Sequence, residues 1–246
     1  MGYAQTYFQI VTDMLREVIA SEADGIRKAA EKIAETAERG GKIYFFGATH
    51  AGILAEEAFY RSGGLVIINP ILPEGLTCTV RPITDTSARE RVDGLGAEIA
   101  EETGLGAGDL LLIHSVSGRN AVPVDMAVCA RKKGVYVIAI TSLVYSRASA
   151  PRAKCGLRLY EAADLVIDNH GVFGDAAVEI RGFAGKAAPT STVTGAAIVN
   201  GICAEVCGIF ADGGMEPPVF SSANMDGGDA RNRELLTRYR DRITYM

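Results

Sequence analysis

The spacing of hydrophobic residues divides the chain into helical and extended segments. Apolar side chains recur every three or four residues over 3–19 and again over 26–37, which predicts two amphipathic helices ahead of the first strand. Between them, Ser21 and Asp24 have the spacing of a capping box, and the glycines at 40–41 follow the second helix. We therefore expect an N-terminal helical hairpin.

From residue 42 onwards, short apolar runs alternate with helical segments. The runs predict buried strands at 43–46, 65–68, 110–113, 135–140 and 165–167. Helical spacing predicts helices at 53–61, 97–103, 121–133, 193–210 and 231–243. Strands without polar alternation, separated by helices, are typical of a parallel sheet that is covered on both faces. With right-handed crossovers, the fold class is α/β, a doubly wound three-layer αβα sandwich with a five-stranded parallel sheet.

The chain shows no internal repeat and no low-complexity linker, so we expect a single domain over residues 1–246. Its expected parts are N-terminal helices at 1–40, a core at 41–211 and a C-terminal helical tail at 212–246. Within the core, residues 69–108 contain three prolines and are the least regular segment.

Composition restricts the classes of function. The 246 residues are 48% hydrophobic and 22% charged, with a formal net charge of −5. This mildly acidic balance argues against nucleic-acid binding, which depends on a basic surface. The apolar runs look too short to span a bilayer, and the first residues lack the basic-then-apolar order of a signal peptide. We therefore expect a cytoplasmic protein with no nucleic-acid or membrane partner.

The cysteines do not have the spacing of a metal site. The five are Cys78, Cys129, Cys155, Cys203 and Cys207. Cys203 and Cys207 lie one helical turn apart within an apolar stripe, but no paired Cys and His residues show zinc-finger spacing. We expect small buried thiols in a reducing compartment and no bound metal.

Small hydroxyl residues separate the strand predicted near residue 110 from the helix that follows it. The first turn of a helix presents unpaired N–H groups and the positive end of its dipole, and serine hydroxyls add further donors. This turn therefore predicts an anion site, and the alternative is an ordinary serine N-cap. The candidate ligand contacts in the turn are Ser115, Ser117, Gly118, Arg119 and Asn120.

Similar turns follow two other predicted strands, one at 47–52 and one after the strand at 135–140. A further cluster of hydroxyl residues precedes the helix at 193–210. Because the carboxyl ends of parallel strands meet at one edge of a sheet, these turns are expected to form one site with residues 115–120. Each could instead only cap a helix. The further candidate contacts are Gly47, Thr49, Thr141, Ser142, Thr190, Ser191 and Thr192.

Three of these stretches, 47–52, 115–120 and 137–142, resemble the sugar isomerase (SIS) domain family, and 189–192 is similar to the segment that opens its last core helix. The resemblance covers about residues 5–210. The tail resembles single-domain members related to phosphoheptose isomerase and N-acetylmuramic acid 6-phosphate etherase. The resemblance implies a flavodoxin-like fold, hydroxyl loops that hold the phosphate of a phosphosugar, and a homodimer or homotetramer with sites completed by a neighbouring subunit.

The chain departs from the family pattern at two places. The first loop of the family usually reads Gly-x-Gly-x-Ser, but Thr49 and Ala51 stand in place of its last Gly and its Ser. Thr49 lacks the conformational freedom of glycine, so the loop could be shaped differently. The helix glutamate of the heptose isomerase and the etherase aligns with Arg61, while Glu57 lies four residues earlier on the same helical face.

Three side chains are candidates for proton transfer: Glu57, His50 and His170. His50 lies in the glycine-rich first loop, and an imidazole that is neutral near pH 7 can move a proton between adjacent carbons. His170 follows the fifth strand and could equally be structural, and His114 is expected to be a structural histidine. Glu56 and Glu57 face different directions, so we select Glu57. Their alternative is a solvated pair in the first turn of the helix.

These features predict an enzyme that acts on a phosphorylated sugar, by aldose–ketose isomerisation or by an etherase-like elimination. Both reactions begin with removal of a proton next to a carbonyl, and they need a base, a neighbouring acid and a fixed phosphate but no metal or organic cofactor. The basic run at 147–158 could close over an anionic sugar, although such runs are usually solvated. The competing interpretation is a non-catalytic phosphosugar-binding sensor or regulatory module, which the altered first loop and Arg61 favour.

Overall fold

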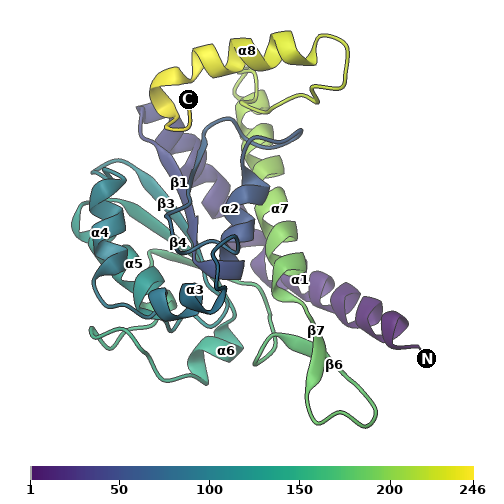
Figure 1. The fold of residues 1–246 in the computed structure, drawn as a ribbon. Coiled ribbons are helices and arrows are strands. Elements are labelled where there is room, and N and C mark those ends of the chain that lie inside the picture. Colours follow the sequence, from purple (N-terminus) through teal and green to yellow (C-terminus); the bar gives the residue numbers. More distant parts are fainter. Residues whose placement is uncertain (1) are drawn as a thin grey trace.

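A computed structural model describes residues 2–246, and at its centre is a sheet of five parallel strands (Figure 1). The strands are β1 (Ile43–Gly47), β2 (Ile68–Ile71), β3 (Leu110–His114), β4 (Tyr136–Thr141) and β5 (Leu165–Asp168). Their order is β2-β1-β3-β4-β5, and every neighbouring pair is parallel. This is the flavodoxin-like order of a doubly wound sheet, so the predicted fold class is confirmed.

The side chains of each strand are shared between two cores, because successive side chains in a strand point to opposite faces. In β1, Ile43 and Phe45 join one core, whereas Tyr44 and Phe46 join the other. The helices that cover the first face are α1 (Tyr3–Arg39), α2 (Ile53–Ala58) and α7 (Ser191–Asp212). The helices that cover the second face are α4 (Leu95–Glu102) and α5 (Ala121–Lys132). The result is a three-layer sandwich.

Shorter elements lie at the two edges of the sheet. Figure 1 shows α3 (Thr84–Arg89) and α6 (Leu143–Arg147) towards the carboxyl ends of the strands, and α8 (Gly228–Arg238) across the opposite end. Three short 3-10 turns complete the chain, at Thr49–Gly52, Leu159–Glu161 and Arg240–Arg242. The loops after β1 and β3, which hold most of the predicted site residues, therefore meet at the edge that carries α3 and α6.

The N-terminal helical hairpin predicted from the sequence is wrong. Residues 3–39 form one continuous helix of 37 residues, α1. Ser21 does not cap a second helix, because its hydroxyl donates to the carbonyl oxygen of Glu17, 3.0 Å away, within the same helix. The two amphipathic stretches are thus two parts of one rod, and its N-terminal part projects beyond the sheet (Figure 1).

A small antiparallel hairpin between β5 and α7 was not predicted. Its strands are β6 (Ala176–Glu179) and β7 (Lys186–Pro189), which are largely exposed or half-buried and carry no clear alternation of polar and apolar residues. The hairpin lies beside the projecting part of α1 (Figure 1), and the hydroxyl of Tyr7 donates to the carbonyl oxygen of Pro189 at 2.8 Å. The end of β7 is thereby fixed just before α7 begins.

Helix α7 is, by length and composition, apolar enough to cross a membrane, which the sequence-based expectation overlooked. In the structure it packs against α1, α2 and the sheet, with Ile198, Ile202 and Val206 buried. Only 39% of its most apolar window is buried, so one side of the helix is covered and the other is not. This is the arrangement of a core helix, whose uncovered side carries mostly small residues such as Ala197 and Ala204.

Candidate functional site

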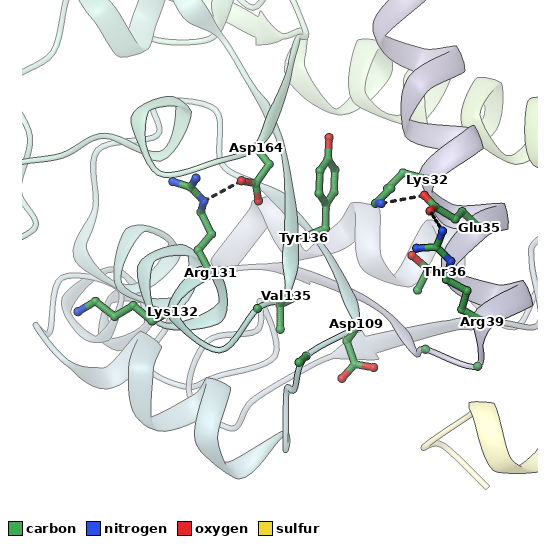
Figure 2. A pocket seen from close by; sticks show the side chains of 15 residues that line it. Lys32, Glu35, Thr36, Arg39, Asp109, Arg131, Lys132, Val135, Tyr136 and Asp164 are labelled. Atoms are coloured by element: carbon green, nitrogen blue, oxygen red, sulfur yellow. Dashed lines mark hydrogen bonds and ion pairs between the residues drawn. The ribbon is translucent and has the colours of Figure 1, made fainter.

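A pocket of about 750 Å³ lies at the amino ends of β3 and β4, beside the end of α1, and we call it the amino-edge pocket (Figure 2). Its charged side chains mostly neutralise one another. Glu35 pairs with both Lys32 and Arg39, and Arg131 pairs with Asp164 at 2.9 Å. Ligands of doubly wound sheets bind at the carboxyl ends of the strands, so this pocket is at the wrong edge for the predicted chemistry.

A second pocket, of about 340 Å³, lies at the carboxyl ends of β1 and β3, and we call it the cleft. It is formed by the loops after these strands, the end of α3, the middle of α6 and the two segments that flank the β6–β7 hairpin. The predicted site residues that line it are Thr49, His50, Ser115, Ser117, Asn120 and Ser191. The structure thus brings together residues from three of the four predicted turns.

The first loop turns back sharply on β1 at Gly47. A Cβ atom at this position would lie 2.4 Å from the carbonyl oxygen of Ala51, so only glycine fits. The turn directs His50 outwards, where its exposed imidazole has Nδ1 3.4 Å from the hydroxyl oxygen of Thr192. Gly47 and Thr192 therefore shape and border this side of the cleft without lining it.

The second loop leads from β3 into α5. Ser115 and Ser117 line the cleft. Within residues 2–246 neither serine hydroxyl has a hydrogen-bond partner, whereas the hydroxyl of the neighbouring Thr141 donates to a backbone carbonyl. In the described chain, the N–H groups of residues 117–120 have no backbone acceptor. These donors precede the positive end of the 12-residue helix α5. The loop can therefore offer hydroxyl and N–H donors to one anion.

The shape of this loop depends on Gly118 and on residues beneath it. Gly118 has φ +57°, and a Cβ atom there would lie 3.0 Å from the hydroxyl oxygen of Thr141. Thr141 donates to the carbonyl oxygen of Ser115 at 2.7 Å. Ser142 accepts from the N–H of Tyr145 at 3.0 Å and donates to a backbone carbonyl. Both hydroxyls are fully buried, so they position the loops rather than face the cleft.

The turn before α7 is held by Asp175, a cleft residue that the sequence analysis missed. Its carboxylate accepts from the hydroxyl of Ser191 at 2.6 Å and from the N–H groups of Ser191 and Thr190 at 2.8 and 3.1 Å. The hydroxyls of Thr190 and Ser191 are therefore bonded within the protein. Asp175 has φ +65° and precedes an unpredicted strand, so no sequence pattern indicated its role.

The structure does not bring Glu57 or His170 into the cleft. Glu57 pairs with Arg61 and accepts from the side-chain amide of Asn200 at 3.0 Å, where α2 meets α7. The Nε2 atom of His170 lies 2.8 Å from the hydroxyl oxygen of Ser21 on α1. Both side chains are thus engaged with helices on one face of the sheet, and their geometry gives no support to the predicted catalytic roles.

His114, expected to be a structural histidine, lines the cleft with an unpaired nitrogen. Its Nδ1 lies 3.1 Å from the carbonyl oxygen of Ala51, and because a carbonyl can only accept, Nδ1 carries the proton. Nε2 is then an acceptor, and it has no partner within residues 2–246. Burial lowers the pKa of His114 to about 4, so the imidazole is neutral at physiological pH.

Glu90 is, after His114, a second cleft residue with a shifted pKa, and the sequence analysis did not identify it. It follows α3 in the irregular segment, and its carbonyl oxygen accepts the N–H of Val122 in the first turn of α5 at 3.1 Å. Burial raises the pKa of the Glu90 carboxyl, while a hydrogen bond from Asn120 opposes the rise. A carboxyl with a raised pKa in a cleft is suited to acid–base chemistry near neutral pH.

Comparison with known proteins agrees with this geometry. Residues 6–142, more than half of the chain, match the family model of the SIS domain. The chain belongs to the SIS domain family. A UPF0309 protein of Shouchella clausii is 44% identical to it over 246 residues, which span all of both chains.

Solved structures show the same fold at low sequence identity. A phosphoheptose isomerase from Neisseria gonorrhoeae matches with a TM-score of 0.56 at 15% identity, covering 83% of this chain and 97% of that one. The Vibrio vulnificus NanR protein complexed with ManNAc-6P matches with a TM-score of 0.53 at 12% identity, covering 96% and 69%. At these identities the likeness is one of fold.

The two departures of this SIS domain from the usual family pattern have visible structural consequences. Thr49 adopts φ +56°, a region that residues with a Cβ atom seldom occupy, and its N–H donates to the carbonyl oxygen of Leu76 at 2.7 Å. The loop therefore keeps a glycine-like turn without glycine. Arg61, the residue predicted to match the family glutamate, lies beyond the end of α2 and forms an ion pair with Glu57.

Proposed function

We propose that this SIS protein binds a phosphorylated sugar in the cleft and catalyses proton transfer next to its carbonyl, as a phosphosugar isomerase or an etherase-like lyase. The observation that carries the proposal is the juxtaposition of an anion-binding loop, residues 115–120, with Glu90 and His114 in the same cleft. Membership of the SIS family supports it, as do structural neighbours named as a phosphoheptose isomerase and as a complex with ManNAc-6P.

The phosphate would bind to the loop between β3 and α5. The hydroxyls of Ser115 and Ser117 and the N–H groups that precede α5 are donors without partners in the described chain, and the helix dipole favours a negative charge there. A phosphate fixed at one end of a short carbon chain holds the other carbons in register. The loop thus supplies the positioning that both reactions need.

Proton transfer is assigned to Glu90, assisted by His114. Glu90 removes the proton from the carbon next to the carbonyl, since its raised pKa makes the carboxylate a stronger base than an exposed glutamate. The neutral Nε2 of His114 accepts a hydrogen bond from a sugar hydroxyl. Isomerisation results when this proton returns to the adjacent carbon and the hydroxyl proton passes to the former carbonyl oxygen. Elimination results when the leaving group departs from the neighbouring carbon and takes up a proton. His50, at the mouth of the cleft, remains a candidate proton donor.

We also propose that the protein is a cytoplasmic homodimer or homotetramer. The uncovered side of α7, which carries small residues that allow close packing, supports this, together with exposed apolar residues on α1, among them Phe8 and Ile19. Exposed large apolar side chains such as these are frequent at contacts between proteins.

Incubation with a panel of phosphosugars in heavy water tests the catalytic proposal. The wild-type protein should introduce carbon-bound deuterium, and Glu90→Gln should slow the exchange by about a hundredfold or more. Glu57→Gln is the matched control, because Glu57 lies outside the cleft in an ion pair and its loss should leave the exchange rate nearly unchanged. Exchange that depends on Glu57 and not on Glu90 would contradict this assignment.

The second candidate function is a phosphosugar-binding module without catalysis. It is favoured by the pairing of Glu57 with Arg61 and by Ala51, which offers no hydroxyl where the family loop usually has Ser. Calorimetry distinguishes the two functions. If the wild-type protein binds phosphosugars, Ser117→Ala weakens this binding and no hydrogen exchange occurs, the protein is a binding module and not an enzyme.

A further inference from the structure

Three arginines lie beside the cleft, next to Glu90, and we call Arg91, Arg119 and Arg152 the arginine cluster. The guanidinium of Arg152 donates to Oδ1 of Asn120 at 2.9 Å, and its N–H donates to the carbonyl oxygen of Arg119 at 2.8 Å. Arg91 directly follows Glu90 in the chain. Because Asn120 and Glu90 line the cleft, the cluster adjoins its rim.

The charges of the arginine cluster are not balanced by ion pairs. Within residues 2–246 none of its members pairs with a carboxylate, although Arg131 and Arg158 nearby in the sequence do. The Nε atom of Arg119 is buried and has no hydrogen-bond partner in the described chain. Slight desolvation and the positive charges of Arg119 and Arg91 lower the pKa of the exposed Arg152, and the nearby Glu90 opposes this shift. Gathered like charges repel, and a bound anion relieves that repulsion.

Asn120 connects the arginine cluster with the chemistry of the cleft. It is the N-cap residue of α5, yet its side chain makes no cap hydrogen bond to the helix. Its amide instead accepts from Arg152 and donates to the carboxylate of Glu90, where it lowers the pKa. The anion-binding loop, the carboxyl of Glu90 and the cluster therefore follow one another along a continuous surface.

Resting on the proposed function, we propose that the substrate carries a second anionic group, which the arginine cluster binds while the loop at 115–120 holds the phosphate ester. A guanidinium presents paired N–H donors that match two oxygens of a carboxylate or a phosphate. The preferred substrates are thus acidic phosphosugars, either sugar-acid phosphates or sugar bisphosphates. A phosphosugar with no other charge would leave the cluster without its counterion.

Matched ligand pairs test this inference by calorimetry on the full chain. Glucose 6-phosphate and 6-phosphogluconate differ by a carboxylate, and fructose 6-phosphate and fructose 1,6-bisphosphate differ by a phosphate. We expect the doubly acidic member of at least one pair to bind about tenfold more tightly than its partner. This ratio corresponds to the free energy of one charge-assisted hydrogen bond. The pair that shows the larger ratio of Kd values identifies the second group as carboxylate or phosphate.

Variants of the cluster assign the effect to these residues. Arg152→Ala should reduce the ratio of Kd values within the preferred pair to near one, and Arg152→Lys, which keeps the charge but loses the fork of donors, should give an intermediate ratio. Arg16→Ala is the control. It removes the same charge from α1, where the side chain is 72% exposed and pairs with Asp13, and should leave the ratio unchanged.

The outcomes separate this inference from the proposed function. Equal affinities within both pairs, with Ser117→Ala weakening all four ligands, would overturn the second anionic group and leave phosphosugar binding intact. If Arg152→Ala and Arg16→Ala reduce the ratio of Kd values equally, the preference is a general effect of charge, and the inference is also overturned. If none of the four ligands binds, the proposed function fails and the inference fails with it.

Discussion

At the scale of single residues, burial shifts the pKa values of two cleft residues, His114 and Glu90, in opposite directions. It lowers the pKa of His114 to about 4 and raises the pKa of Glu90, because in each case the charged form is the one disfavoured. His114 therefore stays neutral over the physiological range. Glu90 holds a proton more tightly than an exposed glutamate does. A hydrogen-bond acceptor and a strengthened base thus face one small cleft.

The depressed pKa of His114 predicts a pH-dependent stability. In the unfolded chain the imidazole titrates near pH 6.5, so below that pH the unfolded state binds a proton that the folded state does not. The contribution is fully present above pH 6.5 and is lost as the pH falls towards 4. It amounts to about 3 kcal/mol at most. Urea unfolding at a series of pH values measures it.

His114→Asn is the matched variant for this measurement, because its side-chain amide can still donate to the carbonyl oxygen of Ala51. The variant should lose less stability than the wild type between pH 6.5 and 4. Parallel pH profiles for the two proteins would show that His114 is not the group responsible.

The sequence identified some site residues better than others, for physical reasons. Ser115 and Ser117 directly follow a buried strand, so their place at the edge of the sheet follows from local order. Glu90 lies in an irregular segment, and a tertiary contact with Val122 fixes it at the cleft. The position of His170 also depends on tertiary structure, since it contacts the part of α1 that the predicted hairpin would have placed elsewhere.

At the scale of elements, the strands of the parallel sheet were well predicted because they are short runs made almost entirely of apolar residues. The exception is β2, which begins at Ile68 although the apolar run begins at Leu65. Residues 65–67 are buried, but the N–H of Val66 donates to the carbonyl oxygen of Pro218 in the C-terminal tail at 2.7 Å. Hydrophobicity alone does not show which partner takes the backbone hydrogen bonds.

The start of α7 offers a prediction at the same scale. Asp175→Ala removes the acceptor for two N–H groups and two hydroxyls at that helix end, so the free energy of unfolding should fall by about 1–2 kcal/mol. Asp212→Ala is the control at the other end of α7, where a negative charge opposes the helix dipole and its loss should cost nothing. Chemical unfolding of both variants measures the difference, and equal losses would contradict a capping role.

At the scale of the whole molecule, the layers and the strand order followed from the alternation of strands and helices, whereas the outer surface did not. The sequence could not show that α1 is one rod, because Ser21 is compatible with a helix interior as well as with a cap. It also could not show that one side of α7 stays uncovered. These two helices contact each other, and together they provide the surface proposed for self-association.

Sedimentation velocity tests that surface. The wild type should sediment as a dimer or tetramer, and Phe8→Glu, which places a charge on a side chain that is 70% exposed, should shift the population towards monomer. Met225→Glu is the control on the loop before α8, at a side chain that is 67% exposed. If Met225→Glu dissociates the oligomer and Phe8→Glu does not, the interface lies at the C-terminal tail and not on α1.

The length of α1 has a structural consequence. At 1.5 Å per residue, a helix of 37 residues is a rod about 55 Å long. Near one end Tyr7 holds the carbonyl of Pro189, a residue of the cleft wall, and at the other end Arg39 borders the amino-edge pocket. A molecule that binds the projecting turns therefore contacts the same continuous helix that holds Pro189 in one wall of the cleft.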